Sequence, residues 1–258
     1  MTSRSSDDGG VELLVEGAVA TVTLNRPDRL NSQTPATWRA LAAVGAGLGP
    51  EVRIVVVRGE GRAFSAGLDR SLFTADPGVA DGLGAIAQGS EAEIAERIAE
   101  FQAGFLWLTE GSAISIAAVQ GHAIGAGFQL ALACDLRVLA EEATLTMAET
   151  SLGLVPDLTG TAPLVRAVGY SRALEICATG RRVAAAEAGA LGLATAVVPA
   201  DQLTGAVSDL VAALLAAPPE SLAATKQLLL DAADRTRVEQ NQAERLSQVP
   251  LLRRLRES

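Results

Sequence analysis

The sequence predicts an α/β fold of stacked ββα units followed by a helical C-terminal segment. Short runs rich in β-branched residues alternate with stretches of helical period as far as about Cys177. From about Val198 the period is helical throughout. The 258 residues are 49% hydrophobic, and a chain of this length can bury on the order of 75% of its unfolded surface. We therefore expect a disordered tail over 1–10, one large core over 11–197 and a helical C-terminal segment over 198–258.

Each element follows from a change in hydrophobic period. Alternating apolar residues predict strands, and apolar residues three or four apart predict helices. The tail is polar and lacks the apolar centre of a signal peptide. A weakly periodic stretch predicts a loop that covers a binding mouth. In chain order we expect a hairpin of 11–16 and 19–24, a helix over 34–48, a strand over 53–58, the loop over 71–89, a helix over 90–110, and helices over 201–216, 220–233 and 235–247.

Composition argues against several classes of partner. A net charge of −9, from 30 acidic and 21 basic residues, disfavours nucleic acid, and 3% aromatic residues supply few stacking surfaces. No apolar run reaches the length of a membrane span. The single histidine and two cysteines give neither a metal-ligand spacing nor a disulfide framework. We expect a cytoplasmic protein that binds no metal, membrane or nucleic acid.

Two glycine-rich turns carry the most functional information. Residues 64–69 follow the apolar strand at 54–58, and residues 121–128 follow a second apolar run and lead into a helix. Glycine lets the main chain approach a ligand without a Cβ in the way. A helix N-terminus presents free N–H groups and the positive end of its dipole. The two turns therefore predict a cradle in which main-chain amides bind one oxygen anion.

From about Val11 to its C-terminus the chain resembles the enoyl-CoA hydratase/isomerase family, also called the crotonase family. The resemblance implies a crotonase-like spiral of ββα units, an acyl-CoA thioester substrate, and a C-terminal segment that assembles homotrimers or dimers of trimers. Coenzyme A is then part of the substrate, and no separate cofactor is implied. The motifs that carry it are Thr23-Leu24-Asn25-Arg26-Pro27, Arg62-Ala63-Phe64-Ser65-Ala66-Gly67-Leu68-Asp69, Gln120-Gly121-His122-Ala123-Ile124-Gly125-Ala126-Gly127 with Cys134-Asp135-Leu136-Arg137, and Glu149 followed by Leu152-Gly153-Leu154-Val155-Pro156.

By that resemblance, the thioester carbonyl lies in an oxyanion hole formed by the N–H groups of Leu68 and Ala126. Other residues of the two turns line the substrate. Arginines of the N-terminal part contact the phosphates of coenzyme A, because an acidic protein needs local positive charge to hold that anion. The substrate-binding residues expected from the turns, the following helix and these arginines are Arg29, Ala66, Gly67, Asp69, Gly125 and Gln129, with Arg26, Arg62 and Arg70 as further phosphate contacts.

The acid/base groups distinguish the reactions of the family. Its hydratases use two glutamates, and this chain has Gln129 at the first position and Glu149 at the second. An amide cannot take up a proton at working pH. Members that keep only the second carboxylate move a double bond, so the resemblance implies isomerisation with Glu149 as the one acid/base. Its pKa would need an apolar wall to raise it. Met147, Leu152, Leu154 and Val155 are the candidates for that wall.

Several alternatives stay open. Asp157 stands where dienoyl-CoA isomerases of the family carry an aspartate, yet it could equally cap the helix through Val165. Enoyl-CoA hydration by Glu149, with or without Asp157, is a second reaction. A third reading is an acyl-CoA-binding protein without activity. His122 is expected to be structural, and Lys226, the only lysine, is expected on a solvated helix face.

Overall fold

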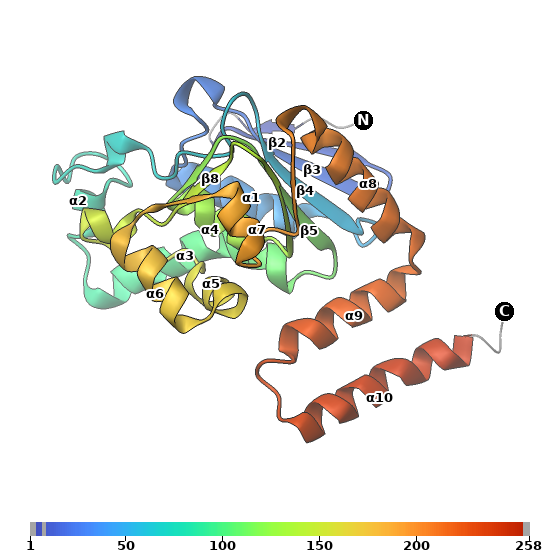
Figure 1. Ribbon diagram of the computed structural model, residues 1–258. Helices are drawn as coiled ribbons and strands as arrows, with labels where there is room; N and C mark the ends of the chain where they lie inside the picture. Colours follow the sequence, from blue (N-terminus) through green and yellow to red (C-terminus); the bar gives the residue numbers. More distant parts are fainter. Residues whose placement is uncertain (1–3, 7–8, 255–258) are drawn as a thin grey trace.

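The structure is a computed structural model that describes residues 4–6 and 9–254 (Figure 1). Within those ranges, a seven-stranded sheet has the order β1-β2-β3-β4-β5-β7-β10, and a three-stranded sheet has the order β6-β8-β9. The strands are β1 Arg4–Ser6, β2 Val11–Glu16, β3 Val19–Leu24, β4 Ile54–Gly59, β5 Ile114–Val119, β6 His122–Ile124, β7 Leu136–Ala140, β8 Thr144–Thr146, β9 Arg182–Ala184 and β10 Ala196–Val198.

Helices cover the sheets and extend beyond them. The α-helices are α1 Pro35–Gly47, α2 Leu83–Ile86, α3 Glu91–Glu110, α4 Ala126–Ala133, α5 Thr161–Val168, α6 Tyr170–Thr179, α7 Ala185–Ala190, α8 Leu203–Ala216, α9 Pro219–Asp231 and α10 Arg237–Arg254. The 3₁₀ helices are η1 Pro27–Arg29, η2 Arg70–Leu72, η3 Glu149–Leu152 and η4 Ala200–Gln202. The predicted hairpin, the helices expected over 34–48 and 90–110, and the strand expected over 53–58 are confirmed within one or two residues.

The large sheet is buried on both faces. From β3 to β10 its neighbouring strands pair in parallel, and parallel sheets are covered on both sides. In β4, Val55 and Val57 belong to the core shared with α1, α3 and α4, whereas Ile54 and Val56 pack into a second cluster with α8. This alternation is the two-residue period of a strand. The sheet therefore separates two apolar layers (Figure 1).

The small sheet brings the second turn beside the first. After β5 the chain enters β6 through Gly121, and α4 follows β6 directly. Strand β6 pairs in parallel with β8, which comes later in the chain. The order β5, β6, α4 is one ββα unit, and β7, β8 and the helices after η3 form the next. The parallel bridge between Ser65 and Ala123 then joins the strand end after β4 to β6. Both glycine-rich turns thus lie at one end of the parallel sheet.

Three sequence expectations need correction. Part of the tail expected to be disordered is ordered, because Arg4–Ser6 pair with 11–13 and Gly9 is buried; residues 1–3 and 7–8 lie outside the described residues. The loop over 71–89 contains the short helix α2. Helix α10 continues through Pro250, which removes one main-chain donor without ending the helix.

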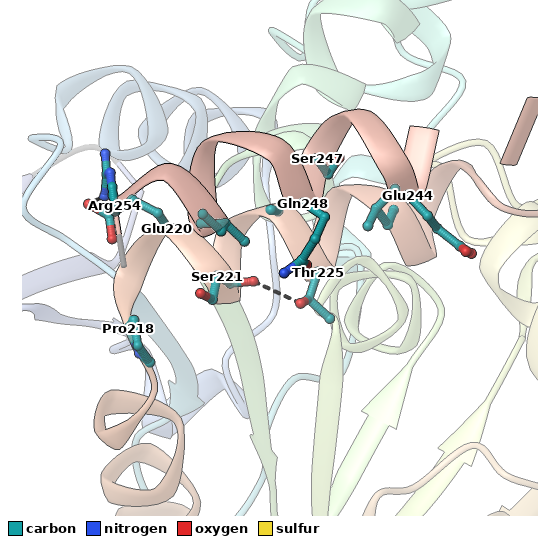
Figure 2. A pocket seen from close by; sticks show the side chains of 11 residues that line it. Pro218, Glu220, Ser221, Thr225, Glu244, Ser247, Gln248 and Arg254 are labelled. Atoms are coloured by element: carbon teal, nitrogen blue, oxygen red, sulfur yellow. Dashed lines mark hydrogen bonds and ion pairs between the residues drawn. The ribbon is translucent and has the colours of Figure 1, made fainter. Parts of the chain in front are cut away.

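Helices α9 and α10, here called the C-terminal arm, pack on each other and lie away from the sheets (Figure 1). Figure 2 shows the groove between them, which has a volume of about 380 Å³. Arm side chains that stay exposed include Leu229, Val238, Leu246, Val249 and Leu252. The arm therefore presents apolar surface that this chain does not cover.

Lys226 ties the arm to the core, and its predicted solvated position is wrong. Its side chain is 6% exposed, and its Nζ donates to Asp135 Oδ2 at 2.9 Å, Ala113 O at 2.7 Å and Leu108 O at 3.2 Å. The helical period placed Lys226 on a polar face, but that face meets the end of α3. The ammonium is stabilised there by one carboxylate and two carbonyl dipoles.

No individual helix in the described ranges has both the length and the apolar composition of a membrane span. The segments Ala200–Ala216 and Pro219–Asp231 meet those criteria only as a pair, and they are bent by 106° at the break between them.

Candidate active site

The first glycine-rich turn is held by main-chain hydrogen bonds on both sides. On one side, Ser65 N donates to His122 O at 2.9 Å and Ile124 N donates to Ser65 O at 3.0 Å. On the other side, Gln33 N donates to Gly67 O at 2.7 Å and Asp69 N donates to Gln33 O at 2.8 Å. These bonds fix the path of residues 65–69 without using any side chain of the turn.

Gly67 is the point where the two turns touch. Its φ of +81° favours glycine, and a Cβ added there would lie 2.4 Å from Ile124 O and 3.5 Å from Ala126 N. A side chain at this position would push the turns apart. The amide of Ala126 is therefore next to the residue that precedes Leu68, as the cradle requires.

The two amides expected to bind the oxygen anion have no other partner. Leu68 N and Ala126 N donate to no acceptor within residues 4–6 and 9–254. Ala126 is the first residue of α4, where an N–H cannot reach an intrahelical carbonyl. Both donors stay unpaired, and the Ala126 amide lies at the positive end of the α4 dipole.

The Asp69 carboxylate is held by donors of the protein itself, and the substrate contact expected of this residue stays a prediction. Its Oδ1 accepts from the N and Oγ of Ser71, and its Oδ2 accepts from Ser32 Oγ at 3.0 Å and Arg26 Nη2 at 3.1 Å. Burial opposes ionisation, but these donors outweigh it and lower the pKa of Asp69 to about 2. Arg26 is likewise occupied, so it is not a free phosphate contact.

The other N-terminal arginines remain available. Arg29, Arg62 and Arg70 are exposed, and none has an ion-pair partner in the part of the chain that the structure describes. Arg29 ends η1 and Arg70 begins η2, the two short helices that flank the first turn. Ala66 is half-buried, and its N–H donates a hydrogen bond to Leu30 O at 2.9 Å. The arginines thus supply positive charge around the turn.

The two carboxylate oxygens of Glu149 differ in hydrogen bonding. Its Oε1 accepts from Gln129 Nε2 at 2.7 Å, whereas Oε2 is buried and has no hydrogen-bond partner. Burial raises the pKa of Glu149; local backbone amides and Gln129 oppose this rise, and the charge of Asp157 adds to it. A Cβ at Gly125 would lie 3.1 Å from Oε1, so the carboxylate sits against the start of α4.

Gln129 is fully buried and donates a hydrogen bond to Glu149, and the substrate contact expected of it stays a prediction. Its Oε1 accepts from Leu158 N at 2.8 Å and from Gly160 N at 3.3 Å. All three hydrogen bonds of this amide lie inside the protein. The sequence offered no sign of this link, because its partners are 20 to 31 residues away in the chain.

Asp157 does not cap a helix. The N-cap of α5 is Gly160, which has no side-chain cap, and Asp157 uses only its carbonyl, which accepts from Gln102 Nε2 at 2.7 Å. The Asp157 carboxylate is half-buried, and within residues 4–6 and 9–254 its one hydrogen-bond donor is its own backbone amide. Burial raises the pKa of Asp157. The capping alternative is therefore wrong, and the carboxyl group lies close enough to Glu149 for its charge to raise the pKa of Glu149.

The expected apolar wall is only partly right. Met147 is fully buried, but Leu152, Leu154 and Val155 are 54%, 38% and 71% exposed. Cys177 of α6, which the sequence gave no reason to place here, lies close enough for Glu149 to raise the pKa of its thiol, in addition to the effect of burial. Helix α6 packs on η3, so a later helix contributes the cover that the residues after Glu149 do not.

His122 has the structural role expected for it. Its Nδ1 makes a 2.9 Å hydrogen bond with Thr144 Oγ1 of the neighbouring strand, and its ring is exposed. Within residues 4–6 and 9–254, no three His, Cys, Asp or Glu side chains are grouped so that they could hold a metal ion.

Comparison with known proteins identifies relatives across nearly the whole chain. The family model described as enoyl-CoA hydratase/isomerase matches residues 15–253. A Thermobifida fusca structure in complex with CoA has 49% identity and a TM-score of 0.90, and covers 96% of this chain and 95% of its own. A second structure of that organism's protein, in complex with acetoacetyl-CoA, has 48% identity, a TM-score of 0.90 and 95% coverage of both chains.

A Thermus thermophilus protein is 36% identical over 217 residues, which are 83% of this chain and 81% of the relative. It and the Thermobifida fusca protein carry the name "putative enoyl-CoA hydratase". These matches confirm the predicted crotonase-like fold of ββα units with a C-terminal helical segment.

Proposed function

The chain belongs to the enoyl-CoA hydratase/isomerase family, and we propose that it moves a carbon–carbon double bond of an acyl-CoA from position 3 to position 2. Glu149 is the single acid/base in this proposal. The observation that carries it is that Glu149 Oε2 is buried and has no hydrogen-bond partner. The neighbouring side chain, Gln129, cannot exchange protons.

The proposed substrate class rests on relatives and on charge. The Thermobifida fusca protein is known in complex with CoA and with acetoacetyl-CoA. In this chain the exposed Arg29, Arg62 and Arg70 flank the first turn, where they would meet anionic phosphates. Coenzyme A is part of the substrate in this proposal, and no separate cofactor is needed.

The proposed chemistry conserves one proton. Glu149 Oε2 removes a proton from C2 of a 3-enoyl thioester, and the electron pair moves to the carbonyl oxygen as an enolate. The N–H groups of Leu68 and Ala126 stabilise that oxygen, each typically by about 3 kcal/mol. The protonated Glu149 then returns the proton to C4 as the double bond forms between C2 and C3. Its raised pKa suits it to both steps.

Hydration of a 2-enoyl thioester is the second candidate. The relatives are named as hydratases, and Asp157 supplies a second desolvated carboxyl group. In this reaction Glu149 would activate water that adds at C3, and a proton would be added at C2. Asp157 would take the role that Gln129 cannot fill.

A spectroscopic turnover assay tests the proposal. Formation of a 2-enoyl thioester from a 3-enoyl thioester raises the absorbance of the conjugated thioester, whereas hydration lowers it. We expect a rise with 3-enoyl-CoA, lost about 10³-fold in Glu149→Gln. A fall with 2-enoyl-CoA and no rise with 3-enoyl-CoA would favour hydration. Unchanged acyl-CoA affinity with no turnover of any enoyl or dienoyl thioester would instead indicate a binding protein.

We also propose that the C-terminal arm assembles a homotrimer or a dimer of trimers. The groove between α9 and α10 and the exposed Leu229, Val238 and Leu246 support this proposal, because apolar surface of this kind is typical of subunit interfaces. Light scattering of the full chain gives the mass in solution. Replacing these three leucine and valine residues by serine should reduce that mass, and a monomeric wild-type protein would contradict the proposal.

A further inference from the structure

We propose that Gln129 is a positioning residue that confines the transferable proton of Glu149 to Oε2. This inference rests on the proposed acid/base role of Glu149. It differs from the family's use of two acids, because the group at position 129 acts here by holding a carboxylate and takes no part in proton exchange.

The orientation of the Gln129 amide follows from its partners. Leu158 N and Gly160 N both donate to its Oε1, so the opposite orientation would set an NH₂ group against two N–H donors. The NH₂ group must therefore face Glu149, whose Oε1 lies 2.7 Å away. Two main-chain donors thus determine which end of the amide meets the acid.

That contact makes the two oxygens of Glu149 unequal. Oε1 accepts a hydrogen bond from Gln129, so a proton on Oε1 would face an N–H donor. Oε2 is buried, has no partner and is free to carry the proton. One oxygen must then both remove and return the proton, which keeps the transfer on one face of the acyl chain.

The segment that orients Gln129 is itself under strain. Thr159, between the two donor amides, has a φ of +70°, which is unfavourable for a β-branched residue. Strain of this kind persists where surrounding contacts impose it, and the shared bond to Gln129 Oε1 is one such contact. A Cβ at Gly160 would lie 2.7 Å from Gln129 Cγ, so the segment also packs closely on the amide.

The test is the pH profile of kcat/KM for conversion of 3-enoyl-CoA in Gln129→Met. The Gln129 bond favours the carboxylate, so its loss should move the acid limb to higher pH. We expect kcat/KM to fall about tenfold on the acid limb and to stay within about threefold on the high-pH plateau, because the lost charge-assisted hydrogen bond changes the ionisation of Glu149 and not its action once ionised. A purely structural role would lower kcat at every pH.

Gln102→Met is the matched control. Gln102 Nε2 donates to Asp157 O, so this variant removes a hydrogen bond to the same segment without touching Glu149. Its acid limb should stay at the wild-type position. If Gln129→Met does not fold, Gln129→Glu replaces it, since a glutamate keeps an acceptor for Leu158 N and Gly160 N. Its carboxylate should also shift the limb to higher pH.

A second readout needs no turnover. Titration of ¹³C-labelled glutamate side chains by NMR, with Glu149 assigned by its loss in Glu149→Gln, follows the ionisation of Glu149 directly. The midpoint should rise in the Gln129 variant and stay constant in Gln102→Met. An unchanged midpoint overturns the inference even if the enzyme is active. A raised midpoint in a protein that converts no enoyl thioester supports it and rejects the proposed reaction instead.

Discussion

Asp69 and Glu149 are two acids of the same site whose surroundings differ. Asp69 accepts four hydrogen bonds, one of them from Arg26, and its pKa falls to about 2. Glu149 accepts one side-chain bond, keeps Oε2 without a partner, and has a raised pKa. Both stand in motifs of the family, but only Glu149 has an oxygen left for a ligand. The number of donors around a carboxylate, rather than its motif, separates the structural acid from the candidate catalytic one.

Asp135 extends the comparison to a third acid. Removing its partner Lys226 should have the largest effect on stability. Its Oδ2 accepts from the N and Oγ of Ser115 and from Lys226 Nζ. Lys226→Met should lower the free energy of unfolding by about 3 kcal/mol, because a half-buried carboxylate and two carbonyl groups lose the buried ammonium that pairs with them. Urea denaturation measures this. A loss below about 1 kcal/mol would show that Asp135 does not depend on its cation.

Asp69→Asn should lower the free energy of unfolding by about 2 kcal/mol, the value of a carboxyl pKa held near 2. The change removes the charge that Arg26 and the serines stabilise. Activity per folded molecule should stay within about threefold. A 10³-fold loss of kcat with unchanged stability would place Asp69 among the catalytic residues and break the comparison.

Glu149→Gln should have the opposite sign. Removing a desolvated carboxylate should raise the free energy of unfolding by about 1 kcal/mol, while the hydrogen bond from Gln129 is kept. The same urea titration at neutral pH provides the measurement. Destabilisation by this substitution would mean that Glu149 has stabilising partners in the folded protein.

The smallest expected effect is the change with pH in the stability differences caused by Asp69→Asn and Glu149→Gln. It separates the two acids most clearly, because the two changes have opposite signs. The lowered pKa of Asp69 gives stability that is present above about pH 4 and lost as the pH falls toward 2. The raised pKa of Glu149 gives stability that is present below about pH 4 and lost as the pH rises through the folded value. The deficit of Asp69→Asn should therefore shrink in acid, and the gain of Glu149→Gln should grow with pH. Parallel curves for the two variants would contradict this.

The sequence predicted most of the fold and the main-chain part of the site. Strand and helix periods located β2 to β4, α1 and α3, because local hydrophobic order decides those elements. The glycines placed the two turns together, since their close approach at Gly67 excludes a side chain. Neighbouring residues in the sequence are therefore enough to predict the path of the main chain in these elements.

Side-chain partnerships over long separations were not encoded in this way. Arg26 with Asp69, Gln129 with Glu149, and Lys226 with Asp135 join residues 20 to 91 positions apart. The sequence therefore gave no sign of the partners of Asp69 and Gln129, and it placed Lys226 on a solvated face, which is wrong. The last predicted helix also ended too early, at residue 247, whereas α10 continues through Pro250 to Arg254.

Lys226 is the only lysine in the chain, and its amine is shut away between the arm and the core. A reagent that acylates lysine side chains thus has one target, which it reaches only when the arm lifts. The rate at which Lys226 is acylated, followed by mass spectrometry, therefore reports how often the arm separates from the core, without any engineered label.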